Sequence, residues 1–107
     1  MYKLSRAAAA DIEKIAENSL VEFGSAQTGK YLASLHGCLE LLAKNHEMGR
    51  EIEEIRPGYR KFPHQSHLIF YRRENAGDIL IVRVLHHLMD AVRHLTPNTP
   101  LLSRQRK

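Results

Sequence analysis

Residues 67–85, HLIFYRRENAGDILIVRVL, carry the clearest structural pattern in the chain. Within them, residues 67–73 are rich in aromatic and β-branched residues, which favour strands. Residues 75–78 follow and predict a tight hairpin turn, since Asn and Gly tolerate positive φ. In residues 79–85, six of the seven are apolar, which predicts a strand covered on both faces and near the middle of a sheet. Arg83 is the exception within that apolar run.

The residues before this hairpin predict a neighbouring strand at 59–62 and a turn at 63–66, which begins with a proline. Aromatic residues alternate here with basic ones, a pattern that also occurs in proteins that stack bases of single-stranded nucleic acid. Aromatic strand residues opposite helices are more often core, and we interpret them so. They are Tyr59, Phe62, Phe70 and Tyr71.

The first 45 residues show helical periodicity. After a short predicted strand at residues 2–4, Ser5 is a good helix N-cap. Gly24 supplies the stop of a first helix and Ser25 can cap a second, which lasts to about Asn45, so the two helices are predicted to form an antiparallel hairpin. The apolar positions that define the two helices, and that we interpret as core, are Ile12, Ile15, Leu20 and Phe23, then Leu32, Leu35, Leu39 and Leu42.

The predicted order of elements is therefore β-α-α-β-β-β, an α+β fold with the helix hairpin packed on one face of a small antiparallel sheet. Residues 46–54 are expected to be a solvated connection, and residues 88–95 a short helical turn. We expect a single domain over residues 1–95, followed by a basic, mobile tail over residues 96–107.

Charge divides unevenly between the two halves of the chain. Residues 1–54 hold six Lys/Arg against nine Asp/Glu, a net of −3, whereas residues 55–107 hold ten against three, a net of +7. The second half thus offers a positive field to an acidic partner. No apolar run approaches the roughly 20 residues of a membrane helix and no signal peptide is evident, so we expect a cytoplasmic protein with no membrane contact.

Single residues give little support to a metal, a cofactor or a reactive thiol. Cys38 is the one cysteine of the chain and is predicted to be a small buried hydrophobe. Adjacent His86 and His87 should point to opposite faces of a strand, which prevents them from holding one ion. His64 and His67 bracket a turn without a further ligand beside them. We therefore expect no metal and no cofactor.

The element order and several segments together resemble the RelE/ParE toxin superfamily, with details closer to its ParE arm. The match runs in order from residue 2 to about residue 95. The segments are Tyr2-Lys3-Leu4-Ser5, an alanine-rich stretch and Asp11-Ile12; Leu42-Ala43-Lys44-Asn45 before Met48-Gly49-Arg50; IRPGYRKFP at 55–63; SHLIFYR at 66–72; and IVRVLHH at 81–87 before Met89-Asp90.

This resemblance implies a toxin of a type II toxin-antitoxin system, silenced by a ParD-like antitoxin in a hetero-oligomer. The ParE arm implies inhibition of DNA gyrase by trapping its cleaved DNA complex, with no catalytic residues of its own. No direct sequence-specific binding of nucleic acid is expected. An exposed sheet edge or an apolar groove could accept the antitoxin as an added strand or an amphipathic helix.

Two alternatives stay open. A RelE-type, ribosome-dependent mRNA endoribonuclease needs a base, an acid and cations. The cations exist at Arg60, Lys61, Arg72 and Arg83, and His86 and His87 could replace a missing group. However, no tyrosine follows Tyr71, and Leu88, Met89 and Asp90 occupy the place of the late acid or base in the nuclease arm. The second alternative is an inactive toxin-like interaction module.

The candidate residues for contact with the target lie in the C-terminal part of the sheet and the segment after it. Arg60 and Lys61 alternate along a strand, so they face opposite sides. Arg83 could instead be a buried or half-buried cation satisfied by a carboxylate such as Asp90, or by backbone carbonyls. The full set of candidates is Arg60, Lys61, Arg83, His86, His87, Met89, Asp90 and Arg93.

Overall fold

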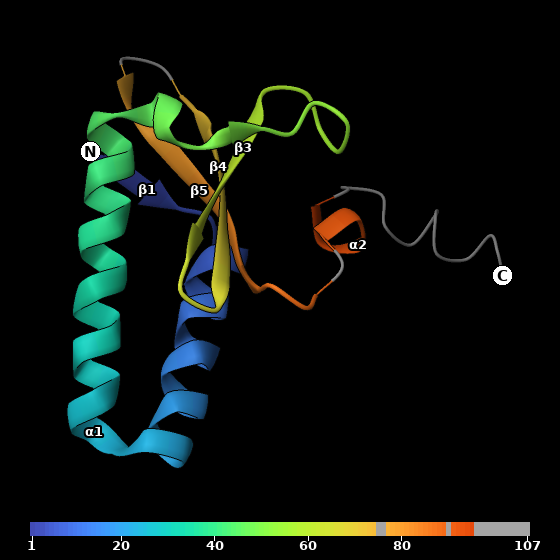
Figure 1. Ribbon diagram of the computed structural model, residues 1–107. Helices are drawn as coiled ribbons and strands as arrows, with labels where there is room; N and C mark the ends of the chain where they lie inside the picture. Colours follow the sequence, from blue (N-terminus) through green and yellow to red (C-terminus); the bar gives the residue numbers. More distant parts are fainter. Residues whose placement is uncertain (75–76, 90, 96–107) are drawn as a thin grey trace, which may run out of the picture.

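Two antiparallel helices pack on one face of a five-stranded sheet in the computed structural model, which describes residues 1–74, 77–89 and 91–95 (Figure 1). The elements are β1 (Tyr2–Leu4), α1 (Arg6–Lys44), the 3-10 helix η1 (His46–Met48), β2 (Arg50–Glu51), β3 (Tyr59–His64), β4 (His67–Arg73), β5 (Ile79–His86) and α2 (Ala91–Leu95). The predicted α+β class is confirmed. Residues 75–76 of the expected turn, Asp90, the side chains of residues 92 and 93 and the tail 96–107 lie outside the described residues.

Gly24 divides α1 into the two helices of the predicted hairpin. Its φ of +87° and ψ of 175° form a combination open almost to glycine alone. At the start of α1, the Ser5 hydroxyl accepts a hydrogen bond from the Ala8 N–H at 2.9 Å, which confirms the predicted N-cap. The same hydroxyl donates to the Val82 carbonyl of β5 at 2.8 Å. The cap therefore also attaches the helix to the sheet.

The strands of the sheet have the order β1-β5-β4-β3-β2. β3, β4 and β5 form the predicted antiparallel meander, and β5 lies between two neighbours as expected. The sheet is mixed rather than purely antiparallel because β1 pairs parallel to β5. The helix hairpin leads from β1 at one edge of the sheet to β2 at the other, and the meander then returns β5 to the side of β1. The expected solvated connection contains one more strand, β2, which pairs with Arg60 and Lys61 at the edge of β3.

β3 is two residues longer than predicted, because Pro63 and His64 belong to the strand and not to the turn. Residues 65–66 alone connect β3 to β4. His64 and His67 form the hydrogen-bonded pair that closes this two-residue hairpin. Hydrogen-bonded and non-hydrogen-bonded pairs alternate along an antiparallel ladder, so the next pair, Pro63 and Leu68, exchanges no hydrogen bonds. The Pro63 nitrogen therefore faces the outer edge of β3, where a proline removes no ladder hydrogen bond.

A β-bulge changes which residues of β5 face the helices. The register shifts between Phe70 and Tyr71 of β4, and Val82 is the extra residue of β5. With strict alternation, Val84 and Ile81 would lie on opposite faces of the sheet. Because of the bulge, both residues pack in the core beneath α1.

Each face of the sheet carries one buried apolar cluster. The cluster under α1 contains Ala8, Leu35, Cys38, Leu39, Leu42, Ile69, Tyr71, Ile79, Ile81 and Val84. The cluster on the opposite face contains Ile52, Phe70, Leu85 and Leu95 of α2. β5 is thus covered on both faces, and Cys38 is the buried hydrophobe predicted from the sequence. Burial raises the pKa of its thiol, which disfavours the reactive thiolate.

Tyr71 is the largest fully buried residue and fixes the passage from helix to sheet. Its hydroxyl donates to the His46 carbonyl at 2.6 Å and accepts from the Gly49 N–H at 2.8 Å. Burial raises the pKa of this phenol. A Cβ at residue 49 would overlap the Tyr71 hydroxyl and ring, so the close approach requires glycine.

We expect Gly49→Ala to lower the free energy of unfolding by about 2–4 kcal/mol, since the added methyl must displace a buried aromatic ring and break its hydrogen bond. Urea unfolding followed by circular dichroism measures this. Gly37→Ala is the matched control, because no atom lies within 4 Å of a Cβ there. An alanine inside an exposed helix should stabilise the protein by up to about 1 kcal/mol. Equal unfolding midpoints for the two variants would contradict this account.

Candidate functional site

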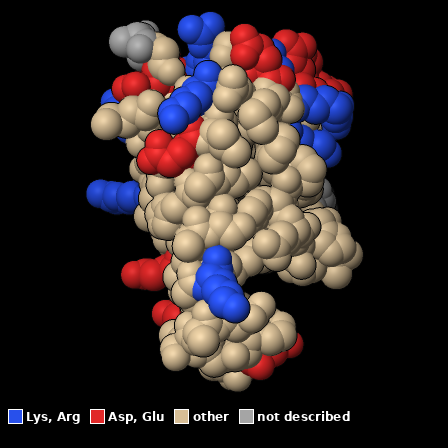
Figure 2. Space-filling model, turned by 60° about the vertical axis from the view of Figure 1, so that its left-hand side comes forward, with Lys and Arg blue, Asp and Glu red and all other residues tan. Residues whose placement is uncertain are grey.

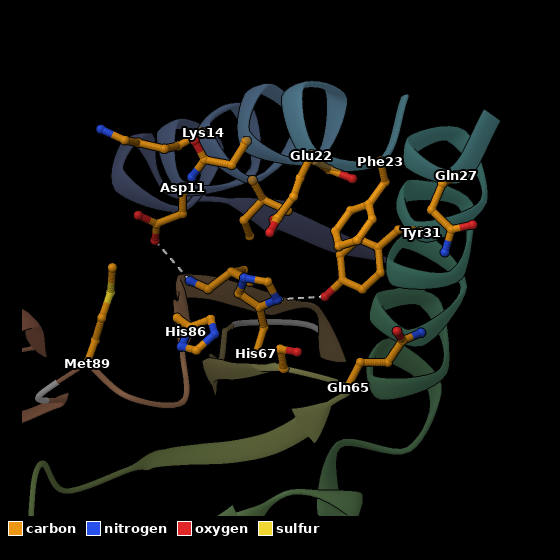
Figure 3. Close-up of a pocket in the computed structure, with 15 residues that line it drawn as sticks. Asp11, Lys14, Glu22, Phe23, Gln27, Tyr31, Gln65, His67, His86 and Met89 are labelled. Carbon is orange, nitrogen blue, oxygen red and sulfur yellow. Dashed lines mark hydrogen bonds between the residues drawn. The ribbon is translucent and has the colours of Figure 1, made fainter. Parts of the chain in front are cut away.

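A groove of about 620 Å³ lies between α1 and the end of the sheet at the β3–β4 turn, and we call it the hairpin groove (Figure 3). It combines aromatic and aliphatic side chains with amides, hydroxyls and both signs of charge. Its lining residues are Asp11, Lys14, Ile15, Asn18, Ser19, Glu22, Phe23, Gln27 and Tyr31 of α1, and Gln65, Ser66, His67, Val84, His86 and Met89.

Histidines form the floor of the hairpin groove. The Tyr31 hydroxyl lies 2.8 Å from Nδ1 of His67, and the His86 ring meets the His67 ring edge-on, with centroids 5.6 Å apart (Figure 3). Burial lowers the pKa of His67, and the neighbouring His86 lowers it further, so the neutral imidazole is favoured. His86 faces the groove because the bulge in β5 has switched the alternation of the strand.

The sequence prediction that His86 and His87 point to opposite faces is wrong. Their rings are stacked with centroids 4.6 Å apart. β5 ends at His86, so the alternation rule no longer holds for His87, whose N–H donates to the Ser66 carbonyl at 2.9 Å. The two imidazoles therefore lie side by side at the end of the sheet.

Arg83 is partly buried and satisfied by a carboxylate, as one of the sequence interpretations expected, and this carboxylate is Asp11 of α1. Nε and Nη2 of Arg83 each donate to one carboxylate oxygen of Asp11 at 2.8 Å. Both side chains are largely buried, 21% and 13% exposed, and the hydrogen bonds to Asp11 raise the pKa of Arg83. The Val84 N–H also donates to Asp11, at 2.9 Å. One carbonyl takes part as expected, since Nη1 reaches that of His94 at 3.4 Å.

Arg60 and Lys61 face opposite sides of the sheet, as their alternation predicts, and both lie away from the hairpin groove. Arg60 donates to the Gly49 carbonyl at 2.6 Å and pairs with Glu51 at 3.1 Å, so it holds β2 to β3. Lys61 lies opposite Phe70 of β4, on the side of the second cluster. These contacts give Arg60 a structural role.

The residues after β5 are the most accessible part of the predicted set. His87 is exposed, Leu88 and Met89 are 79% and 50% exposed, and the Met89 N–H donates to the His86 carbonyl at 2.9 Å. These three exposed residues after β5 are referred to below as the 87–89 segment. The structure thus brings His86, His87 and Met89 together, while Asp90 and the side chain of Arg93 lie outside the described residues.

Phe23 and Leu20 were predicted as core but are 62% and 49% exposed. The tip of the helix hairpin extends beyond the sheet, so no strand lies beneath these side chains (Figure 1). Lengths could have signalled this: the 20 residues of the second helix span about 30 Å, whereas the seven residues of β4 span about 23 Å. Phe23 instead lines the hairpin groove.

Neither a metal centre nor a membrane span is found in the part of the chain that the structure describes. No group of three or more His, Cys, Asp or Glu residues there is placed to hold an ion. The described helices also lack the combination of length and apolar character that crossing a membrane requires.

Comparisons with known proteins agree on one family. The family model described as ParE toxin of type II toxin-antitoxin system, parDE, matches residues 2–91. Toxin ParE1 of Mycobacterium tuberculosis is 44% identical over 94 residues, which are 88% of this chain and 96% of that protein. Toxin ParE1 of Caulobacter vibrioides is 38% identical over the same shares. A solved structure titled chromosomal ParDE TA system from P. aeruginosa has the same fold, with TM-score 0.68 and 22% identity over 79% of this chain and 92% of that one.

We expect Asp11→Asn to lower the free energy of unfolding by about 2–3 kcal/mol, because it leaves the half-buried Arg83 without its charged partner. Chemical unfolding at neutral pH measures this. Glu13→Gln removes the same charge from an exposed position of the same helix and should change stability by less than about 0.5 kcal/mol. A stability of Asp11→Asn equal to that of the control would refute the structural role of this ion pair.

Proposed function

The chain belongs to the ParE toxin family of type II toxin-antitoxin systems, and we propose that it acts in the cytoplasm by binding DNA gyrase and trapping the enzyme with its DNA cleaved. The family match over residues 2–91 carries this proposal, because it covers nearly all of the described structure. The 87–89 segment is the proposed contact surface for gyrase, together with His86 behind it. It presents an imidazole and two exposed apolar side chains at a fixed end of the sheet.

The engagement of the arginines favours a non-enzymatic toxin over a ribonuclease. Cleavage of RNA needs cations that are free to stabilise a charged phosphorane. Three of the four cations that could serve this cleavage are in ion pairs: Arg83 with Asp11, Arg60 with Glu51 and Arg72 with Glu74, at 2.8, 3.1 and 3.2 Å. The fourth, Lys61, lies on the side of the second cluster, away from the hairpin groove. The groove that contains His67 and His86 is lined by Glu22 and by the paired Asp11 against a single lysine, Lys14, so its lining has no excess of positive charge to attract a phosphate.

The hairpin groove is the proposed site for a ParD-like antitoxin. A peptide-binding groove needs apolar anchors for affinity and a few polar groups for orientation. Phe23, Ile15 and Met89 supply the first, and the lining amides, hydroxyls and imidazoles supply the second. Toxin and antitoxin would then form a hetero-oligomer, in which the antitoxin covers the exposed Phe23 ring.

Met89 links the two proposed surfaces, because it lines the hairpin groove and also belongs to the 87–89 segment. An antitoxin bound in the groove therefore covers part of the toxin surface that is proposed to contact gyrase. Neutralisation follows by direct competition, without a conformational change of the toxin.

We expect the purified protein, incubated with gyrase, supercoiled plasmid and ATP, to yield linear DNA after denaturation with detergent and protease. The double variant His87→Ser/Met89→Ser should lower the amount of linear DNA at least about tenfold, since interface energy concentrates in a few buried anchors. Leu41→Ser is the control, because Leu41 is a 52% exposed apolar residue of α1 far along the chain from this segment.

Intact DNA, under conditions in which a known gyrase poison linearises it, would refute gyrase as the target. Transcript cleavage in a translating extract would then identify the ribonuclease alternative, and no activity in either assay would identify an inactive module. Linear DNA at the same level with the double variant would leave gyrase as the target and move its contact surface elsewhere.

We expect Phe23→Ser to weaken binding of the antitoxin by about 10- to 100-fold, which corresponds to the burial of one large aromatic side chain. Isothermal titration of toxin with antitoxin measures this. Val21→Ser is the matched control, since Val21 is 91% exposed on the same helix and is outside the groove lining. Equal affinities of the two variants would place the antitoxin away from the groove.

A further inference from the structure

A second groove, of about 610 Å³, lies at the end of the β3–β4 hairpin opposite its turn, and we call it the arginine groove. Arginines reach it from β3, from β4 and from the loop between β2 and β3: Arg56, Arg60, Arg72 and Arg73. The rest of its lining is His46, Glu51, Glu53, Pro57, Gly58 and Tyr59. Charged side chains gather at this upper end of the molecule, while the middle of the face in view is largely uncharged (Figure 2).

The sequence Arg56-Pro57-Gly58-Tyr59 builds one wall of this groove as a tight turn. The Tyr59 N–H donates to the Arg56 carbonyl at 3.2 Å, and Gly58 has φ +83°. Proline second and glycine third are the residues that a type II turn demands. The turn brings its first and last side chains together, so the Arg56 guanidinium lies 5.3 Å from the centre of the Tyr59 ring. The ring orients this guanidinium while its five N–H donors remain available.

The carboxylates around the arginine groove already have partners within the protein. Glu53 accepts the Gly58 N–H at 3.0 Å, which closes the loop that carries the turn. Glu51 pairs with Arg60, and Glu74 pairs with Arg72 and with Lys3. Within residues 1–74, 77–89 and 91–95, by contrast, no ion pair includes Arg56 or Arg73. Two guanidinium groups therefore face the groove with their charge uncompensated by a carboxylate.

The composition of the arginine groove distinguishes its ligand from that of the hairpin groove. Seven of its ten lining residues are arginine, glutamate or histidine, and Tyr59 is the one large apolar side chain among them. A peptide would find few apolar anchors here. Binding of a phosphate backbone needs none, because it depends on Lys/Arg contacts and on release of counterions. Planar guanidinium forks match phosphate oxygens in pairs.

We propose that the arginine groove binds the phosphate backbone of duplex DNA, without sequence preference, through Arg56 and Arg73. The choice of DNA over RNA rests on the proposed function, because gyrase holds a DNA duplex beside any protein bound at its cleavage site. The six steps along β4 separate this groove from the turn near the 87–89 segment by roughly 20 Å. One toxin molecule can therefore contact gyrase at one end of the hairpin and DNA at the other.

Fluorescence anisotropy with a labelled DNA duplex, in the absence of gyrase, tests this groove separately from the gyrase proposal. We expect binding that weakens steeply between about 50 and 200 mM salt. The double variant Arg56→Gln/Arg73→Gln should bind about tenfold more weakly and lower the slope of log K against log salt by about 2. Lys30→Gln is the control, an exposed lysine on the second helix of α1. An unrelated duplex of equal length should bind equally well.

The proposal would be overturned if the arginine variant, the lysine control and the unchanged protein all had the same DNA affinity and the same salt slope. The same holds if the arginine variant keeps its DNA affinity and loses antitoxin, which would assign the groove to an acidic peptide. Salt-dependent DNA binding without gyrase-dependent linear DNA would support the groove and refute the gyrase target. If the folded arginine variant no longer binds DNA but still yields as much linear DNA as the unchanged protein, gyrase is supported as the target. The proposed role of the arginine groove is then refuted.

Discussion

The carboxylate of Asp11 is the contact on which the arrangement of helices and sheet depends. It accepts two hydrogen bonds from Arg83 and one from the Val84 N–H, at 2.8 to 2.9 Å. β1 pairs with β5 no further than Ile81, so beyond that residue Asp11 provides the acceptor that a neighbouring strand would otherwise supply. A helix residue thereby completes the edge of the sheet and holds α1 over the end of β5.

The bulge beside this contact determines which side chains of β5 face the helices. It returns Val84 to the core and turns His86 toward His67. The helix hairpin is longer than the strands and extends past the same end of the sheet, which leaves Phe23 exposed there. Two grooves of different chemistry result at the two ends of one β-hairpin, the first with apolar anchors and the second with arginines. Under the proposed function, the first groove serves the antitoxin and the second serves the DNA that gyrase holds.

Sequence patterns predicted most elements to within a residue or two, because strands, caps and turns depend on nearby residues. Periodicity could not distinguish a buried face from an exposed one at Leu20 and Phe23, since an apolar stripe looks the same where the sheet beneath it has ended. Pro63 was assigned to a turn by its usual preference, yet β3 tolerates it because β2 pairs only with Arg60 and Lys61 and leaves that side of the strand open at Pro63. Of the candidate residues, the exposed His87 and Met89 remain proposed contacts for the target, whereas Arg60 and Arg83 are in ion pairs within the protein.

The sequence alone determined the helix hairpin at Gly24, the cap at Ser5, the meander and membership of the ParE family, because each depends on local conformational preference or on similarity read directly from residues. Only the tertiary structure decided that Arg83 pairs with Asp11, 72 residues away, and that His86 and His87 stack. The reason is physical. Which carboxylate meets a cation depends on how helix and sheet pack, and strand alternation depends on a bulge and a strand end that the partner strand defines.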